Sequence, residues 1–202
     1  MTTTGTERTW YYVTQRGAGS QPVFDTGERR SACVAAIGSS GFEVHGFAVL
    51  PWRYHLLLKS TAELLGPGLR SLIQGITRRL RRPGDPPRPV LAARCDWTAV
   101  EEREIPPLLA EVHFSPVAAR LVTELGRYEW SSYQYYGGTA DQPPWLMLGR
   151  LQRDSTQPPP PRSTIPPTVS SIPPAYDAAR DDRKTPAFGL DLAAIDSAAP
   201  AD

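Results

Sequence analysis

The sequence predicts an α+β fold in which helices pack on an antiparallel sheet of four to five strands. Three observations lead to this prediction. Short segments rich in aromatic and β-branched residues alternate with longer segments of helical periodicity. Two of the strand-like segments are joined by a very short connection, and the segments follow the order β-α-β-β-α-β-α.

The first part of the chain supplies three predicted strands and one predicted helix. The segment WYYVTQ at 10–15 is aromatic and β-branched, and the turn-forming GAGS follows it. Helical character over 28–39 ends at a Ser-Ser-Gly stop. The apolar segments 42–50 and 54–59 are predicted strands, and the tight connection Pro51-Trp52-Arg53 pairs them as an antiparallel hairpin.

The next part supplies two further helices and a strand. A helix is predicted over 64–82 because apolar residues recur at i, i+3, i+4 and i+7: Leu65, Leu69, Leu72, Ile73, Ile76 and Leu80. After a Pro/Gly-rich loop, 94–101 is a predicted strand. A third helix over 105–114 starts at Pro106-Pro107 and is expected to end at Pro116. This order of elements is that of a ferredoxin-like sandwich.

Proline marks the expected limits of the domain. Twelve of the 22 prolines follow residue 140, and such a segment favours solvated polyproline II over a packed core. The sequence predicts a disordered lead at 1–8, a domain at 9–139 and a Pro-rich, largely disordered tail at 140–202. Within that tail, a short helix is expected near 190–195.

Composition excludes two classes of protein. No apolar run is long enough for a membrane span, and the N-terminal residues lack the apolar core of a signal peptide. The two cysteines, Cys33 and Cys95, lack the spacing of a zinc site. These observations predict a soluble, cytoplasmic protein.

The predicted hairpin carries an incomplete metal-binding pattern. Side chains alternate along a strand, so Arg53 and His55 share one face and Tyr54 points to the other. Two histidines at this spacing can hold a divalent metal that polarises a phosphate. Here a guanidinium, which cannot ligate a metal, replaces one imidazole.

Four segments in order resemble the HUH-type single-tyrosine transposases, in particular the REP-associated tyrosine transposases. They are YYVTQRGAGSQPVF, FEVHGFAVLPWRYHLLLK, VHFSPVAARLV and YEWSSYQYYGG. The family's hairpin usually carries Asn-His-x-His before the leucines, and its third helix carries Tyr-Ile-His-Leu-Asn-Pro. The resemblance spans roughly 10–138. It implies a ferredoxin-like sandwich that cleaves and rejoins single-stranded DNA, with hairpins as substrates.

The resemblance implies three site residues. His55 matches the second histidine of the metal pair, Arg53 stands at the position of the first, and Glu111 stands at the position of the nucleophilic tyrosine. In the family, the histidines hold a divalent cation and the tyrosine attacks the phosphate to form a covalent link. His55 alone offers a weak metal site, so Mg²⁺ or Mn²⁺ is expected only if the protein is active. The departures predict impaired catalysis.

Several functions remain open at this point. The first is a DNA-binding protein that has lost cleavage. The second is an active transposase or nickase in which Arg53 clamps the phosphate and Tyr54, Tyr128 or Tyr133 attacks, with Tyr54 the least suited because it faces away. A third is a protein that binds a cation between the carboxylate of Glu111 and the imidazole of His55. A fourth is a protein-interaction module whose Pro-rich tail binds a partner. A homodimer is a further alternative.

An arginine-rich segment predicts contact with DNA phosphates. Between residues 70 and 94 the sequence has seven arginines and one acid, Asp85. Three of them, Arg78, Arg81 and Arg82, are spaced to share one face of the predicted helix. The expected DNA-binding residues are Arg16, Arg70, Arg78, Arg79, Arg81, Arg82 and Arg94.

Some other polar and aromatic residues are expected to be structural. We expect structural roles for His45, His113 and the pair Ser131-Ser132. The serines are not expected to be nucleophiles, because no catalytic relay is visible beside them. Base stacking is open to Tyr11, Trp52 and Trp130, although packing explains each more simply.

Overall fold

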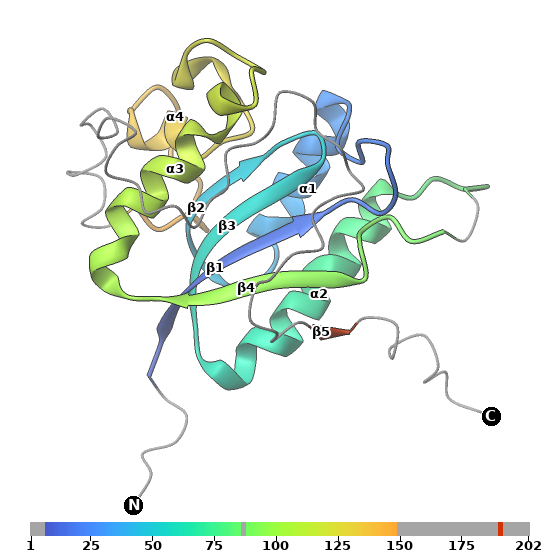
Figure 1. Ribbon diagram of the computed structural model, residues 1–202, viewed down its shortest axis with the longest axis horizontal. Coiled ribbons are helices and arrows are strands. Elements are labelled where there is room, and N and C mark those ends of the chain that lie inside the picture. Colours follow the sequence, from blue (N-terminus) through green and yellow to red (C-terminus); the bar gives the residue numbers. More distant parts are fainter. Residues whose placement is uncertain (1–6, 86–87, 149–189, 192–202) are drawn as a thin grey trace, which may run out of the picture.

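The computed structural model describes residues 7–85 and 88–148 and the backbone of 190–191. Within these residues one antiparallel sheet has the strand order β2-β3-β1-β4-β5 (Figure 1). The strands are β1 (Thr9–Arg16), β2 (Glu43–Val49), β3 (Arg53–Ser60), β4 (Arg94–Val100) and β5 (Leu190–Asp191). With β3 and β1 between β2 and β4, this order is that of a ferredoxin-like sandwich. The predicted fold class is confirmed.

Helices cover both faces of the sheet. The long helices α1 (Gly27–Gly38) and α2 (Ala62–Leu80) contact each other on one face, and α3 (Ile105–Ala118) packs across β2 and β3 on the other (Figure 1). Three short elements complete the description: η1 (Glu102–Glu104), η2 (Leu125–Arg127) and α4 (Tyr133–Tyr136). No helix among the described residues is long and apolar enough to cross a membrane.

A glycine allows α3 to lie close to the sheet. A Cβ atom at Gly46 would stand 2.4 Å from Leu109 Cδ1, which is closer than real Cβ contacts allow. Gly46 follows a register shift in the β2–β3 pairing that begins at Val44. The bulge and the missing side chain together let α3 approach β2, which sets the position of every residue on the inner face of α3.

The amphipathic pattern of α2 is confirmed, but its end was placed too late. Thr61 caps the helix, with its Oγ1 accepting from the Leu64 N–H, and the six predicted apolar residues are buried. The helix ends at Leu80, and Arg81 is already extended. Because Arg82 precedes Pro83, helical geometry is disfavoured there. Arg81 and Arg82 therefore lie outside the helix, and the prediction that they share a helical face with Arg78 is wrong.

The third helix continues past the proline that was expected to stop it. α3 runs to Ala118, with Pro116 in its last turns. Pro116 has no N–H to donate to the Val112 carbonyl, and the Ser115 Oγ donates to that oxygen instead, at 2.7 Å. A side-chain hydrogen bond thus replaces the missing backbone bond.

The packed part of the chain extends beyond the predicted boundary at 139. Leu146 and Leu148 are buried in the core, and the Met147 N–H donates to the Val44 carbonyl at 2.7 Å. Leu190–Asp191 forms a short strand against β4, where a helix was expected. The rest of the predicted tail, including its proline runs, lies outside the described residues.

Candidate functional site

The two faces of β3 carry different side chains, as predicted. Tyr54 is fully buried on the face covered by α1 and α2, where its ring contacts Phe24 with centroids 6.4 Å apart. Arg53 and His55 point to the opposite face and are half-buried. That face is the one on which α3 lies. The side chain of Tyr54 is therefore separated from Arg53 and His55 by the sheet itself.

The structure adds a residue that the sequence did not single out, Tyr12 on β1. Its hydroxyl lies 2.7 Å from His55 Nδ1, and the two rings are nearly parallel with centroids 6.0 Å apart. The pairing of β1 with β3 places Thr14 opposite His55, so Tyr12 is its diagonal neighbour on the same face. Strand alternation gives the face of Tyr12 from sequence, but only the register gives its neighbour.

The pKa values of His55 and Tyr12 are shifted in opposite directions, and both shifts favour the uncharged side chain. Burial, and next the positive charge of Arg53, lower the pKa of His55 to about 3, although the side chain retains some exposed surface. Burial and the negative charge of Glu111 raise the pKa of Tyr12 well above its usual range, against a smaller lowering by Arg53. Near neutral pH the imidazole is neutral and the phenol keeps its proton. Transfer of that proton to His55 is therefore strongly unfavourable.

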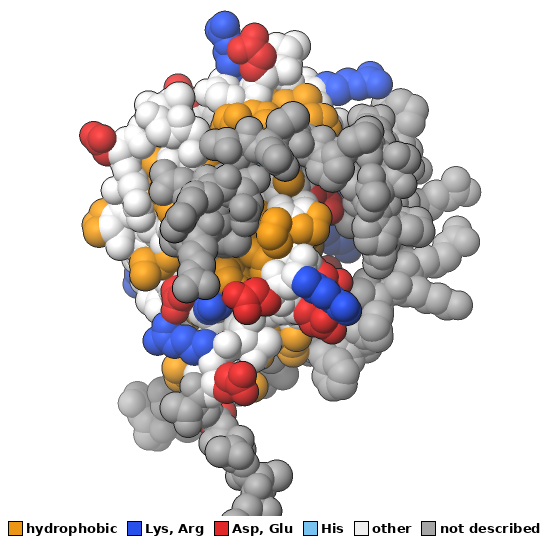
Figure 2. Space-filling view, turned by 90° about the vertical axis from the view of Figure 1, so that its left-hand side faces the viewer, with side chains coloured by type: hydrophobic (Ala, Val, Ile, Leu, Met, Phe, Trp, Pro, Cys, Tyr) orange, Lys and Arg blue, Asp and Glu red, His pale blue; other side chains and the backbone are white. Residues whose placement is uncertain are grey.

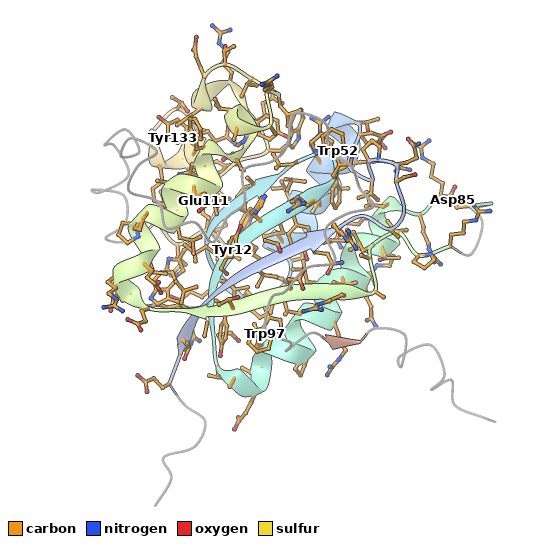
Figure 3. The ribbon with its side chains drawn as sticks, in the orientation of Figure 1. Tyr12, Trp52, Asp85, Trp97, Glu111 and Tyr133 are labelled. Atoms are coloured by element: carbon orange, nitrogen blue, oxygen red, sulfur yellow. The ribbon has the colours of Figure 1, made fainter. Side chains whose placement is uncertain are left out.

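Glu111 lies on α3, the helix that packs over the face of the sheet carrying Arg53 and His55. The residue is half-buried, and burial raises the pKa of its carboxyl group. Its charge acts on Tyr12 across the gap between helix and sheet. Figure 3 shows Glu111 on α3 beside Tyr12 on the sheet. The structure thus brings together the three positions implied by the resemblance, Arg53, His55 and Glu111, with Tyr12 among them.

These residues do not fit a divalent cation. Of the four residues of the site, His55 and Glu111 carry the imidazole nitrogen and carboxylate oxygen that metals commonly bind. One ring nitrogen of His55 already bonds to the Tyr12 hydroxyl. The Arg53 guanidinium brings a positive charge into the same space. Across the described parts of the chain, no group of three or more His, Cys, Asp or Glu side chains could hold a metal. The donor set is too small for a firm metal site.

The alternative tyrosine nucleophiles are engaged elsewhere. The buried Tyr128 donates its hydroxyl to the Val49 carbonyl at 2.7 Å. Tyr133 lies edge-on to His113, with ring centroids 5.6 Å apart. Figure 3 shows Tyr133 beyond α3, away from Tyr12.

The histidines and serines expected to be structural are buried and bonded. His113 Nε2 lies 2.8 Å from the Ser132 Oγ, and burial lowers the pKa of His113 to about 3. Ser131 is fully buried, and His45 bonds to Glu43 at 3.0 Å. Tyr11 is buried against Trp97, and the Trp130 indole donates to Ser31. Packing thus accounts for Tyr11 and Trp130, which had been open to base stacking.

Most of the predicted DNA-binding arginines gather at one end of the sheet. Because neighbouring strands are antiparallel, the ends of β1 and α2 and the starts of β3 and β4 lie together (Figure 1). This end carries Arg16, Arg53, Arg78, Arg79, Arg81, Arg82 and Arg94. Arg70 lies in the middle of α2, away from it. Of the predicted DNA-binding residues, Arg16 is the one that stands next to the site, because the register of β1 and β3 places it opposite Arg53.

Comparison with known proteins identifies the class of fold. A solved structure of a REP-associated tyrosine transposase bound to a REP hairpin matches with a TM-score of 0.53. The match covers 71% of this chain and 87% of that chain at 14% sequence identity. No protein-family model matches the sequence, and no curated protein matches it. The fold is therefore similar to that of a REP-associated tyrosine transposase, in agreement with the resemblance read from the sequence.

Proposed function

We propose that this protein binds single-stranded or hairpin DNA and does not cleave it. One observation carries the proposal: Arg53, His55 and Tyr12 on the sheet face Glu111 on α3, in a fold shared with a transposase that binds a DNA hairpin. The guanidinium suits a phosphodiester, because it donates several N–H groups in a planar fork. DNA as partner also accords with the cytoplasmic location expected from the sequence.

The loss of cleavage follows from the chemistry of the side chains. A carboxylate at Glu111 is a poor substitute for a phenolate in forming a stable covalent link to DNA. Among the described residues, the phenol that bonds to His55 is that of Tyr12, which has a raised pKa and is half-buried. His55, with a pKa of about 3, is too weak a base to remove its proton. Neither an attacking group nor an activating base is ready in this site.

The test is a labelled DNA hairpin with a single-stranded flank, incubated with the protein and Mg²⁺ or Mn²⁺. We expect a retarded band in a native gel and no covalent protein–DNA band in a denaturing gel. A covalent band would contradict the proposal, and peptide mapping would show whether Tyr12 or another tyrosine carries the DNA.

Restoring the two departures tests the alignment behind the proposal. The double substitution Arg53→His with Glu111→Tyr should produce cleavage of a hairpin in the presence of Mn²⁺, whereas each single substitution should not. A folded double variant that cleaves no hairpin of the transposase type would count against the assignment of these two positions.

A further inference from the structure

The outer edge of β4 is paired with another strand over only part of its length. On its inner side, β1 pairs with residues 96–100 of β4. On its outer side, β5 pairs with Arg94 and Cys95 (Figure 1). Among the residues that the structure describes, no strand covers the outer side of residues 96–100, and three of these five residues are exposed. This edge therefore has backbone N–H and C=O groups that a further extended segment could pair with.

The register of β5 indicates which residues would continue along that edge. Asp191 stands opposite Arg94 and Leu190 opposite Cys95, in antiparallel order. If the same register continues, the next three residues of the segment fall opposite the next three residues of β4. These pairs would be Gly189 with Asp96, Phe188 with Trp97 and Ala187 with Thr98. Pro186 has no N–H to donate, so the pairing would end there.

The positions brought into register are chemically complementary. The aromatic residue at 188 would stand opposite Trp97, whose half-buried ring meets Tyr11 edge-on with centroids 5.7 Å apart. Opposed aromatic residues and opposed residues of opposite charge both stabilise a sheet. Arg94, which also pairs with Asp96 at 2.8 Å, stands opposite an acidic residue of β5. Residues 185–202 contain three aspartates and no basic residue, so the charge of the segment suits an edge that begins at an arginine.

The segment can reach this edge from within its own chain. Met147 bonds to Val44 at the β2 edge of the sheet, whereas β5 lies at the other edge. Four strand spacings, or roughly 20 Å, separate β2 from β5. The 41 residues from 149 to 189 join the two places, and an extended chain covers about 3.3 Å per residue. A tethered segment has an effective concentration on the order of 1 mM, which far exceeds that of a second copy at micromolar concentration.

We propose that the outer edge of β4 is a strand-docking site and that residues 187–191 of the same chain occupy it. Backbone hydrogen bonds supply the binding, and the positions opposite Cys95 and Trp97 select apolar residues, which the segment provides at 190 and 188. An edge occupied in this way is closed to pairing with the sheet of a second copy. The proposal concerns the edge of the sheet and is independent of DNA binding.

The register is tested by disulfide formation in the full chain. Opposed positions place Cβ atoms about 4.5–5.5 Å apart, close to what a disulfide needs. With glutathione disulfide as oxidant, Thr98→Cys with Ala187→Cys should therefore form an intramolecular disulfide in most molecules. The matched control is Thr98→Cys with Ala193→Cys, because position 193 falls six residues away along the edge, or about 20 Å. The control pair should form at least several-fold less disulfide.

Two results of this experiment would overturn the proposal. Equal disulfide yields in the two pairs, whether high or low, would mean that the segment has no fixed register on β4. Covalent dimers on a non-reducing gel, in place of cross-linked monomers, would show that a second copy and not the same chain occupies the edge.

A second measurement uses single substitutions and needs no cross-link. Leu190→Ser should raise the hydrogen-exchange rates of the outward-pointing amides of β4 about threefold or more, because the docked strand protects them. Ile195→Ser changes an apolar residue of the same segment beyond the paired positions and should leave these rates unchanged. Unchanged exchange in β1 and β3 would show that both variants fold. Equal rates for the β4 amides in the two variants would overturn the docking site.

Discussion

At the scale of single residues, Ser132 joins three elements through one hydroxyl. Its Oγ accepts from the Phe47 N–H of β2 at 2.9 Å, lies 2.8 Å from His113 Nε2 on α3, and lies 3.2 Å from the Phe47 carbonyl. Both Ser132 and His113 are buried. The pair therefore ties the helix that carries Glu111 to the sheet and is unsuited to act as a nucleophile.

Removing that hydroxyl should destabilise the protein. Ser132→Ala leaves the Phe47 N–H and a buried imidazole nitrogen without partners, which costs about 1–3 kcal/mol for each buried group. We expect a loss of that size in the free energy of unfolding measured with urea. The exposed Ser71 on α2 provides the control, because Ser71→Ala should change stability by less than about 0.5 kcal/mol. Equal effects of the two substitutions would contradict the structural role of Ser132.

The same network predicts how stability depends on pH. The pKa of His113 is about 3 in the folded protein and about 6.5 when the histidine is unperturbed. Between these values the unfolded chain binds a proton that the native protein does not, so stability falls as pH falls. His113 should contribute up to about 1.4 kcal/mol per pH unit. In urea titrations from pH 7 to pH 4, His113→Gln should have the shallower slope. Parallel curves for the two proteins would refute the depressed pKa.

At the scale of elements, α2 is stabilised by its apolar stripe. Leu69 is fully buried between α2 and the sheet, whereas Leu64, in the first turn of the same helix, is 63% exposed. We expect Leu69→Ala to cost about 2–5 kcal/mol of unfolding free energy, because it leaves a cavity. Leu64→Ala removes the same atoms from the surface and should cost less than about 0.5 kcal/mol. Comparable losses in chemical denaturation would show that the stripe is misassigned.

Element boundaries were harder to predict than element types. Periodicity indicated α2, but Pro83 ended it early and moved Arg81 and Arg82 into the following loop. Conversely, Pro116 did not end α3, because the Ser115 hydroxyl satisfies the carbonyl that proline leaves without a donor. Both outcomes depend on the backbone conformation and hydrogen bonds within one turn of a proline. The spacing of apolar residues carries no information about either.

At the scale of the whole molecule, charge is divided between the two ends of the sheet. Arginines dominate the end where β1 and α2 finish, although Glu28 and Asp96 form salt bridges with two of them. Asp85 accepts a hydrogen bond there from the Arg82 backbone N–H. Acids are more frequent at the opposite end, which carries Glu7, Glu43, Glu63, Glu101, Glu102 and Glu104 beside Arg8, Lys59 and Arg103. Figure 2 looks at that second end and shows acidic and basic side chains mixed with exposed apolar ones. A near-neutral chain thus has one basic end, which is the arrangement that the proposed binding of DNA requires.

This distribution predicts a measurable salt dependence. If six arginines contact single-stranded phosphates, the logarithm of the DNA association constant should fall with the logarithm of salt concentration with a slope of about −4. Fluorescence anisotropy of a labelled hairpin across a series of NaCl concentrations measures this slope. A slope near zero would mean that the arginine end does not contact the DNA backbone.

The sequence by itself determined the order of the elements, the fold class and the face of β3 that carries Arg53 and His55. These are consequences of local periodicity, which each segment carries in its own residues. Only the tertiary structure decided that Tyr12 bonds to His55 across 43 residues of sequence and that Arg16 stands opposite Arg53. Both contacts depend on the register between β1 and β3, and that register is set by how the whole sheet packs against its helices.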